Sequence, residues 1–218
     1  IWREFSIERP MLDLRVFANA AYSFSMATRF LGFSSGSGWR FMMSFYLQEV
    51  RGFQPSEVGF LVFSSAVGMA IFSYVSGSLS DRYGTRRWVV LGLVVVVAAS
   101  IYYATLDTGS SIPLLVAVLF ISGMALGIWE VPNTTSAMDA GDESVMNTTG
   151  ALVNVTRNAG NITIIAISSS IVTGVLVARG FEPDIALVGE DTTGAMATAF
   201  LDGARYVYIV LAIGGVAG

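Results

Sequence analysis

Apolar stretches of about twenty residues follow one another along this chain, and they constrain its fold more than any other feature. A helix needs about 20 residues to cross the hydrocarbon layer of a bilayer. Hydrophobic residues make up 54% of the 218 residues and charged residues only 13%, whereas soluble domains carry roughly 25% charged residues. A single soluble core of this size does not hide so much apolar surface. The sequence therefore predicts an all-α polytopic membrane protein.

The pattern predicts six membrane spans, which cover residues 16–47, 57–79, 88–106, 113–131, 148–177 and 204–218. The first is too long for one simple crossing, and its GFSSGSG segment predicts a kink or the close approach of another helix. Ser56 is the expected N-cap of the second span, after Pro55. Residues 180–202 are the longest expected polar loop. Because the chain begins with Ile and breaks off inside an apolar run, we expect a fragment of a longer protein whose last span is truncated.

The arginines near the span ends predict the orientation, since cytoplasmic loops collect basic residues. With the N-terminus inside, the inner side carries Arg3, Arg9, Arg15, Arg82, Arg86 and Arg87. The outer loops instead carry Glu49, Asp107, Glu182, Asp184, Glu190 and Asp191. The chain has no Lys and a net charge of −4, which fits either a salt-rich cytoplasm or a genome that favours Arg codons.

Cys and His are both absent, which removes thiol chemistry, disulfides, the usual zinc sites and histidine acid–base catalysis. No pairing of a nucleophile with a base stands out in the sequence. We therefore expect no enzymatic activity, no metal and no cofactor. The apolar composition makes the lipid bilayer the expected surroundings, and we expect no nucleic-acid partner.

The densest charge cluster, GSLSDRYGTRR at residues 77–87, lies between two apolar spans. Gly77 and Gly84 allow close helix packing or a positive φ. Asp81 can cap, or lie near, the N-terminus of the following helix, where negative charge is favoured. The three arginines can pair with Asp81, with carboxylates of another helix or with lipid phosphates. On physical grounds alone, the segment is a tight cytoplasmic turn that anchors the chain.

The spacing G-x-L-x-D-R-x-G-x-R-R resembles the signature cytoplasmic loop of the major facilitator superfamily, with matches at Gly77, Leu79, Asp81, Arg82, Gly84, Arg86 and Arg87. Residues 11–23 (MLDLRVFANAAYS), 45–61 (FYLQEVRGFQPSEVGFL) and 154–167 (NVTRNAGNITIIAI) are similar to the fourteen-helix drug:proton antiporters of that superfamily. In the first half of such antiporters the fifth helix usually carries a G-P-x-x-G-G-like element and the fourth an early Arg. Here the fifth span lacks that element and the fourth lacks an Arg. The resemblance, which covers nearly the whole chain, therefore implies a six-helix bundle that corresponds to the C-terminal half of such a transporter.

The resemblance implies a secondary active transporter in the cell (plasma or inner) membrane, with proton-coupled efflux of drug-like or hydrophobic small molecules by alternating access. Its partners would be the small-molecule substrate, protons and the missing N-terminal half. Family members use the signature loop as a conformational latch, which here assigns that role to Gly77, Asp81, Arg82, Gly84, Arg86 and Arg87. The alternative is a non-transporting membrane sensor or scaffold that retains the fold, although the intact loop argues for a working latch.

Ionisable residues inside spans are costly and are therefore candidates for function. The candidates for the cavity or for coupling are Arg29, Glu130 and Arg157. Glu130 either carries a proton or binds a cation, or else is a helix-end carboxylate that reaches cytoplasmic water. Arg29 either faces a cavity or makes a structural pair, and Arg157 is either functional or an inner-end anchor. Either arginine can pair with Glu130.

Two inner arginines and one glutamate make a poor stand-alone site for a lipophilic cation. Arg40 lies near the outer end of its span and is expected to be structural. A group of aromatic and Met residues is expected either to line an adaptable cavity or to serve in packing, namely Phe41, Met42, Met43, Phe45, Tyr46 and Trp129.

Overall fold

The computed structural model describes residues 20–139 and 146–217, and this part of the chain is helical and contains no strand. The long helices are α1 (Ala20–Phe45), α2 (Pro55–Tyr83), α3 (Thr85–Tyr103), α4 (Ile112–Asp139), α5 (Met146–Ala178) and α6 (Ala195–Ala217). A π-helical turn, η3 (Tyr46–Val50), continues α1, and a 3₁₀ helix, η5 (Ile185–Glu190), precedes α6. The predicted all-α, six-helix bundle is confirmed.

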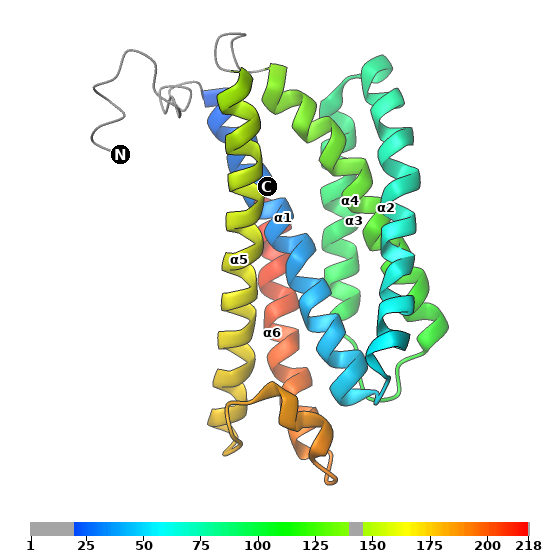
Figure 1. The fold of residues 1–218 in the computed structure, drawn as a ribbon, viewed down its shortest axis with the longest axis vertical. Helices are drawn as coiled ribbons and strands as arrows, with labels where there is room; N and C mark the ends of the chain where they lie inside the picture. The colour runs from blue at the N-terminus through cyan, green and yellow to red at the C-terminus, as the bar shows by residue number, and fades with distance from the viewer. Residues whose placement is uncertain (1–19, 140–145, 218) are drawn as a thin grey trace, which may run out of the picture.

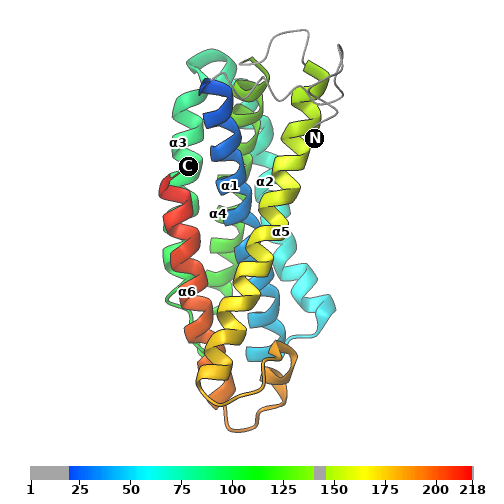
Figure 2. The same ribbon diagram turned by 90° about the vertical axis from the view of Figure 1, so that its left-hand side faces the viewer.

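The six helices lie side by side and alternate in direction (Figure 1). Seen from the side in Figure 2, α3 and α6 form one layer, α1 and α4 the middle, and α2 and α5 the opposite layer. The middle helices make most of the contacts between layers, because α2 packs mainly on α4 and α1 packs on both α5 and α6, while α5 and α6 also contact each other directly. The middle helices therefore connect the two outer layers.

Among the described helices, five are long and apolar enough to cross a membrane, namely α2, α3, α4 to Ser136, α5 from Gly150, and α6 to Val216. Helix α1 has a comparable length of 26 residues but carries Arg29, Arg40 and several serines. Its expected start at Val16 lies outside the described residues. The GFSSGSG segment does not interrupt α1, since the helix is continuous through it, but it does allow close packing, with Gly32 against the ring of Trp129.

Helix α2 begins and ends differently from the expectation. Its N-cap is Gln54, not Ser56, because Pro55 takes the first helical position and the Glu57 carboxylate accepts the Gln54 backbone N–H at 2.8 Å. At the other end α2 continues through Asp81 to Tyr83. The turn between α2 and α3 is thus a single residue, Gly84.

The long polar loop expected at 180–202 is shorter than expected. Residues 185–190 form η5, which buries Ile185 and Val188. Helix α6 begins at Ala195, not near Ala204, because the Asp191 carboxylate accepts the backbone N–H groups of Thr193 at 2.9 Å and Met196 at 2.7 Å. These bonds satisfy donors that a helix N-terminus otherwise leaves free.

The core is rich in aromatic side chains. Trp39 stacks on Tyr103 with ring centroids 5.7 Å apart, and Tyr103 lies 5.4 Å from Tyr208. The Tyr103 hydroxyl pairs with that of Ser122 at 2.8 Å. Of the aromatic and Met residues considered above, four are buried in this core and two are half-buried; the buried ones are Met42, Met43, Tyr46 and Trp129. The structure favours packing as the role of those four.

Candidate functional site

The signature loop is built around a backbone that requires glycine. Gly84 has φ +83°, caps α2 by donating its N–H to the Ser80 carbonyl at 2.9 Å, and also precedes the first residue of α3. A side chain would strain this left-handed conformation. One residue therefore joins two membrane-spanning helices at the end of the bundle where α4 ends and α5 begins (Figure 1).

The charged residues of the loop all point to solvent: Asp81, Arg82, Arg86 and Arg87 are exposed. Asp81 lies in the last turn of α2 and is not the N-cap of α3, which is Gly84. Within the part of the chain that the structure describes, none of the four charges forms an ion pair or a side-chain hydrogen bond.

A groove of about 560 Å³ lies beside this loop, between α1, α3, α4 and α6. Its walls are mainly apolar side chains of α3, and Arg86 lies on its lining together with Thr28 and Asn133. The groove belongs to the side of the bundle that carries α3 and α6.

Arg29 is buried, with 2% of its surface exposed, and its guanidinium bridges three helices. It donates to the Asn133 side-chain oxygen at 3.2 Å and to the Thr134 hydroxyl at 2.8 Å, both on α4. It also donates to the backbone carbonyl of Val153 on α5 at 3.2 Å. Among the described residues it has no carboxylate within ion-pair distance. Of the two roles expected for Arg29, these contacts favour the structural one.

The sequence allowed either Arg29 or Arg157 to pair with Glu130. In the structure Arg157 and Glu130 form the ion pair, with Nη1 and Oε1 3.9 Å apart. Helix α4 continues to Asp139, so Glu130 lies well inside the helix and is not a helix-end carboxylate. Its side chain is 18% exposed, and that of Arg157 is 41% exposed. Arg157 and Arg29 also both lie over the ring of Phe33, at 5.8 and 5.0 Å.

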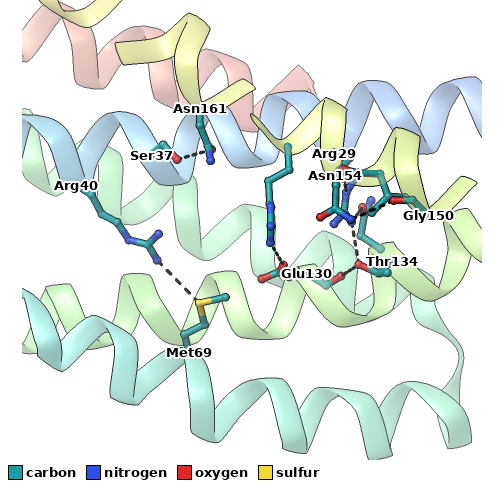
Figure 3. A network of polar contacts seen from close by, with 12 residues as sticks. Arg29, Ser37, Arg40, Met69, Glu130, Thr134, Gly150, Asn154 and Asn161 are labelled. Atoms are coloured by element: carbon teal, nitrogen blue, oxygen red, sulfur yellow. Dashed lines mark hydrogen bonds and ion pairs between the residues drawn. The ribbon is translucent and has the colours of Figure 1, made fainter. Parts of the chain in front are cut away.

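Arg40 extends the cluster along α1. Its Nη2 lies 3.9 Å from the Met69 sulfur on α2 (Figure 3), and its guanidinium lies 5.3 Å from the Trp39 ring. We call these four residues, Arg29, Arg40, Glu130 and Arg157, the charged cluster.

Helix α5 presents a polar face that sequence reasoning missed. Asn154, Arg157, Asn158 and Asn161 recur at the i, i+3, i+4 and i+7 positions of one helical face. Asn154 and Asn158 are exposed, and Asn161 pairs with the Ser37 hydroxyl at 2.5 Å. Exposed amides on a membrane helix are costly in lipid, so this face meets water or protein. The spacing within NVTRNAGN was the signal that could have revealed it.

The opposite end of the bundle carries acidic residues in the loops. Burial raises the pKa of the Glu49 carboxyl, and the nearby carboxylates of Glu190 and Asp184 raise it further. A hydrogen bond from the Gly189 backbone N–H partly offsets this rise in the pKa. Hydrogen bonds from Thr193 and Met196 lower the pKa of Asp191. Asp202 accepts from Arg179, and lies 3.4 Å from the Arg205 guanidinium.

A family model, the Major Facilitator Superfamily, matches residues 1–165, which is more than half of the chain. The chain belongs to the Major Facilitator Superfamily. Its members are membrane transporters of small molecules, which agrees with the six-helix bundle and the five strongly apolar helices. The chain is accordingly part of a multi-pass protein of the cell membrane.

Curated relatives carry related names. The chain is 27% identical over 185 residues to the multidrug resistance protein Stp of Mycobacterium tuberculosis, covering 85% of this chain and 34% of Stp. It is 22% identical over 139 residues to the lincomycin resistance protein LmrB of Listeria monocytogenes, covering 64% and 30%. It is 24% identical over 136 residues to the riboflavin transporter RibZ of Clostridioides difficile, covering 62% and 30%. The chain spans about a third of the length of these relatives.

Proposed function

We propose that residues 1–218 are the C-terminal half of a secondary active transporter that exports drug-like or hydrophobic small molecules in exchange for protons. The observation that carries this proposal is the ion pair of Glu130 and Arg157, placed inside two membrane-spanning helices of a superfamily member. Ionisable groups are rarely kept at such positions without a role. The names of Stp and LmrB support a drug-like substrate, and that of RibZ supports a small aromatic one.

Alternating access requires contacts that exist in one state and break in the other. The exposed charges of the signature loop fit such a latch, since Asp81 and its arginines have no partner within the described bundle. The N-terminal half would supply the opposing charges at the cytoplasmic ends of the helices. Because Gly84 alone separates α2 from α3, a displacement of the loop is transmitted to both helices.

Glu130 is the residue that we assign to proton coupling. When its carboxylate takes up a proton, Arg157 loses its counter-ion and gains freedom to bind elsewhere. When a substrate or the opposite half binds Arg157, Glu130 loses the cation that favours its charged form. Proton uptake and binding at Arg157 are therefore linked, as exchange requires.

The experiment is transport by the full-length protein in proteoliposomes under an imposed pH gradient. The probes are riboflavin, followed by its fluorescence, and lincomycin, which the names of two relatives suggest. The variants are Asp81→Asn for the latch and Glu130→Gln for coupling. Glu182→Gln, which removes an exposed carboxylate far along the chain from both, is the matched control.

We expect gradient-driven movement of at least one probe in the native protein and in Glu182→Gln. Asp81→Asn should reduce the rate at least about tenfold while the thermal unfolding temperature stays unchanged, because the exposed Asp81 side chain forms no ion pair or hydrogen bond with the described residues. Glu130→Gln should abolish the dependence on the pH gradient. Full transport in the Asp81→Asn variant would refute the latch, and a gradient-dependent rate in Glu130→Gln would refute the coupling role.

A further inference from the structure

Two guanidinium groups of the charged cluster are under-paired. Among the described residues, the Arg40 guanidinium has the Met69 sulfur as its one hydrogen-bond partner, and Arg157 stands 3.9 Å from Glu130, which is longer than an N–H···O hydrogen bond. Each guanidinium offers five N–H donors. Among the described residues, neither group reaches an oxygen acceptor at hydrogen-bond distance from its side chain.

The cluster is also unbalanced in charge. The four side chains comprise three cations and one carboxylate, and among the described residues Glu130 is within ion-pair distance of Arg157 alone. An excess of positive charge inside a membrane is costly unless an anion compensates it. Arg29 is buried and donates to three oxygens of α4 and α5, whereas the Arg157 side chain is 41% exposed and Arg40 is half-buried. Arg157 and Arg40 are therefore the groups that a ligand can reach.

We infer that the charged cluster recognises the anionic group of the transported molecule, so that the substrate class is an organic anion with an apolar body. This inference rests on the proposed transporter function and deepens it. A carboxylate matches the planar fork of Arg157, and Arg40 supplies the second positive charge. The polar face of α5, with exposed Asn154 and Asn158 beside Arg157, offers further donors. Glu130 opposes the anion until it is protonated, which ties binding to proton uptake.

Another anion could come from the protein itself, if a carboxylate of the N-terminal half lies permanently on Arg157. The two sources differ in a measurable way. A fixed carboxylate would leave the site without preference for anionic ligands, whereas an open site prefers them. A matched pair of probes with the same apolar body and opposite charge separates these cases.

The probes are 2-naphthoate and 2-naphthylmethylammonium, titrated by their fluorescence against the full-length protein in nanodiscs. We expect naphthoate to bind at least about tenfold more tightly than the ammonium probe. Arg157→Gln should weaken naphthoate binding about tenfold, because a charge-assisted hydrogen bond is lost. It should leave ammonium binding unchanged. Arg157→Lys should restore part of the affinity. Glu130→Gln should strengthen naphthoate binding and remove its pH dependence.

Arg179→Gln is the matched control, since it removes the same charge at the opposite end of the bundle, where Arg179 pairs with Asp202. It should leave both affinities unchanged. Equal affinities for the two probes, a preference for the ammonium probe, or no binding of either would overturn the inference. So would a naphthoate affinity that falls equally in Arg179→Gln and Arg157→Gln, because the effect would then be one of overall charge.

Failure of the proposed function gives a different result. If naphthoate binds preferentially but no probe moves in proteoliposomes under any gradient, the anion site stands and transport does not. If riboflavin or lincomycin is exported while naphthoate shows no preference, transport stands and the anion site does not.

Discussion

Gly123 of α4 lies directly against the backbone carbonyl of Ser65 in α2, leaving no room for a Cβ atom. Gly127, one helical turn further on, is similarly close to the Met69 carbonyl, where a Cβ would lie 2.5 Å away. Small residues at this spacing let two membrane helices approach to backbone contact. Glycines thus set the closest approach of α2 and α4, and the Phe72 and Phe120 rings pack across the same interface.

Gly123→Ala should destabilise the bundle, because a methyl group against a backbone carbonyl pushes α2 and α4 apart. We expect a loss of about 1–3 kcal/mol in the free energy of unfolding. Gly174→Ala on α5 is the control, since nothing lies within 4 Å of a Cβ there. Unfolding of the two variants in detergent micelles checks the prediction, and equal stability of both would show that the helices do not approach as closely as described.

Arg29→Gln should destabilise the fold more than Arg157→Gln. Arg29 is buried and donates to Asn133, Thr134 and Val153, whereas the Arg157 side chain is 41% exposed and makes one long ion contact. We expect a loss of about 3 kcal/mol for Arg29→Gln, because three oxygens lose a charged donor. Equilibrium unfolding of both variants measures the difference. A smaller effect of Arg29→Gln would mean that its bonds are not structural.

The contact between η3 and η5 should weaken as the pH rises. The folded pKa of Glu49 is raised, so the folded state holds its proton more tightly, and this stabilisation is complete below the unfolded pKa of about 4.3. It is lost as the pH rises through the higher folded value. Hydrogen exchange at the Gly189 amide should therefore report increasing opening above about pH 4, once intrinsic exchange is corrected for. Glu49→Gln should remove this trend, and its persistence would assign it to another group.

The start of α6 should show the opposite pH dependence. The pKa of Asp191 is lowered by the hydrogen bonds that its carboxylate accepts, so its capping is present above the unfolded pKa of about 3.9 and is lost as the pH falls through the folded value. The Met196 amide should lose protection from hydrogen exchange in that acid range. Asp191→Ala, which removes the acceptor oxygens, should give low protection at every pH. Unchanged protection in this variant would show that α6 begins without the cap.

The sequence predicted the helices and the signature turn well, because both depend on local patterns. Apolar length locates a span, and the G-x-L-x-D-R-x-G-x-R-R spacing places Gly84 where a positive φ is needed. The helix ends were less predictable. Glu57 at the third helical position pointed to Gln54 as N-cap, but the preference of Ser for caps favoured Ser56. The mainly apolar residues 195–201 were likewise assigned to the polar loop, although they form the first turns of the helix that Asp191 caps.

The charged cluster could be predicted in its members but not in its pairing. Arg29, Glu130 and Arg157 stood out as charges inside spans, yet which arginine meets Glu130 depends on how α1, α4 and α5 pack. The partners of Arg29 are neutral, and neutral side chains such as Asn133 carry no charge signal in a sequence. The polar face of α5 did have a periodic signal, at positions 154, 157, 158 and 161.

The close contact of α2 with α4 bears on how the protein is made. A membrane chain enters the bilayer from its N-terminus, so α2 and α3 are both inserted before α4 has been synthesised. Helix α3 contacts α2 only slightly and packs mainly on α4 and α6. The surface of α2 that packs on the glycines of α4 is therefore exposed to lipid until α4 has been synthesised. The helices of this bundle therefore do not assemble in sequential pairs. Helices α1, α2 and α3 pack together only once α4 is present.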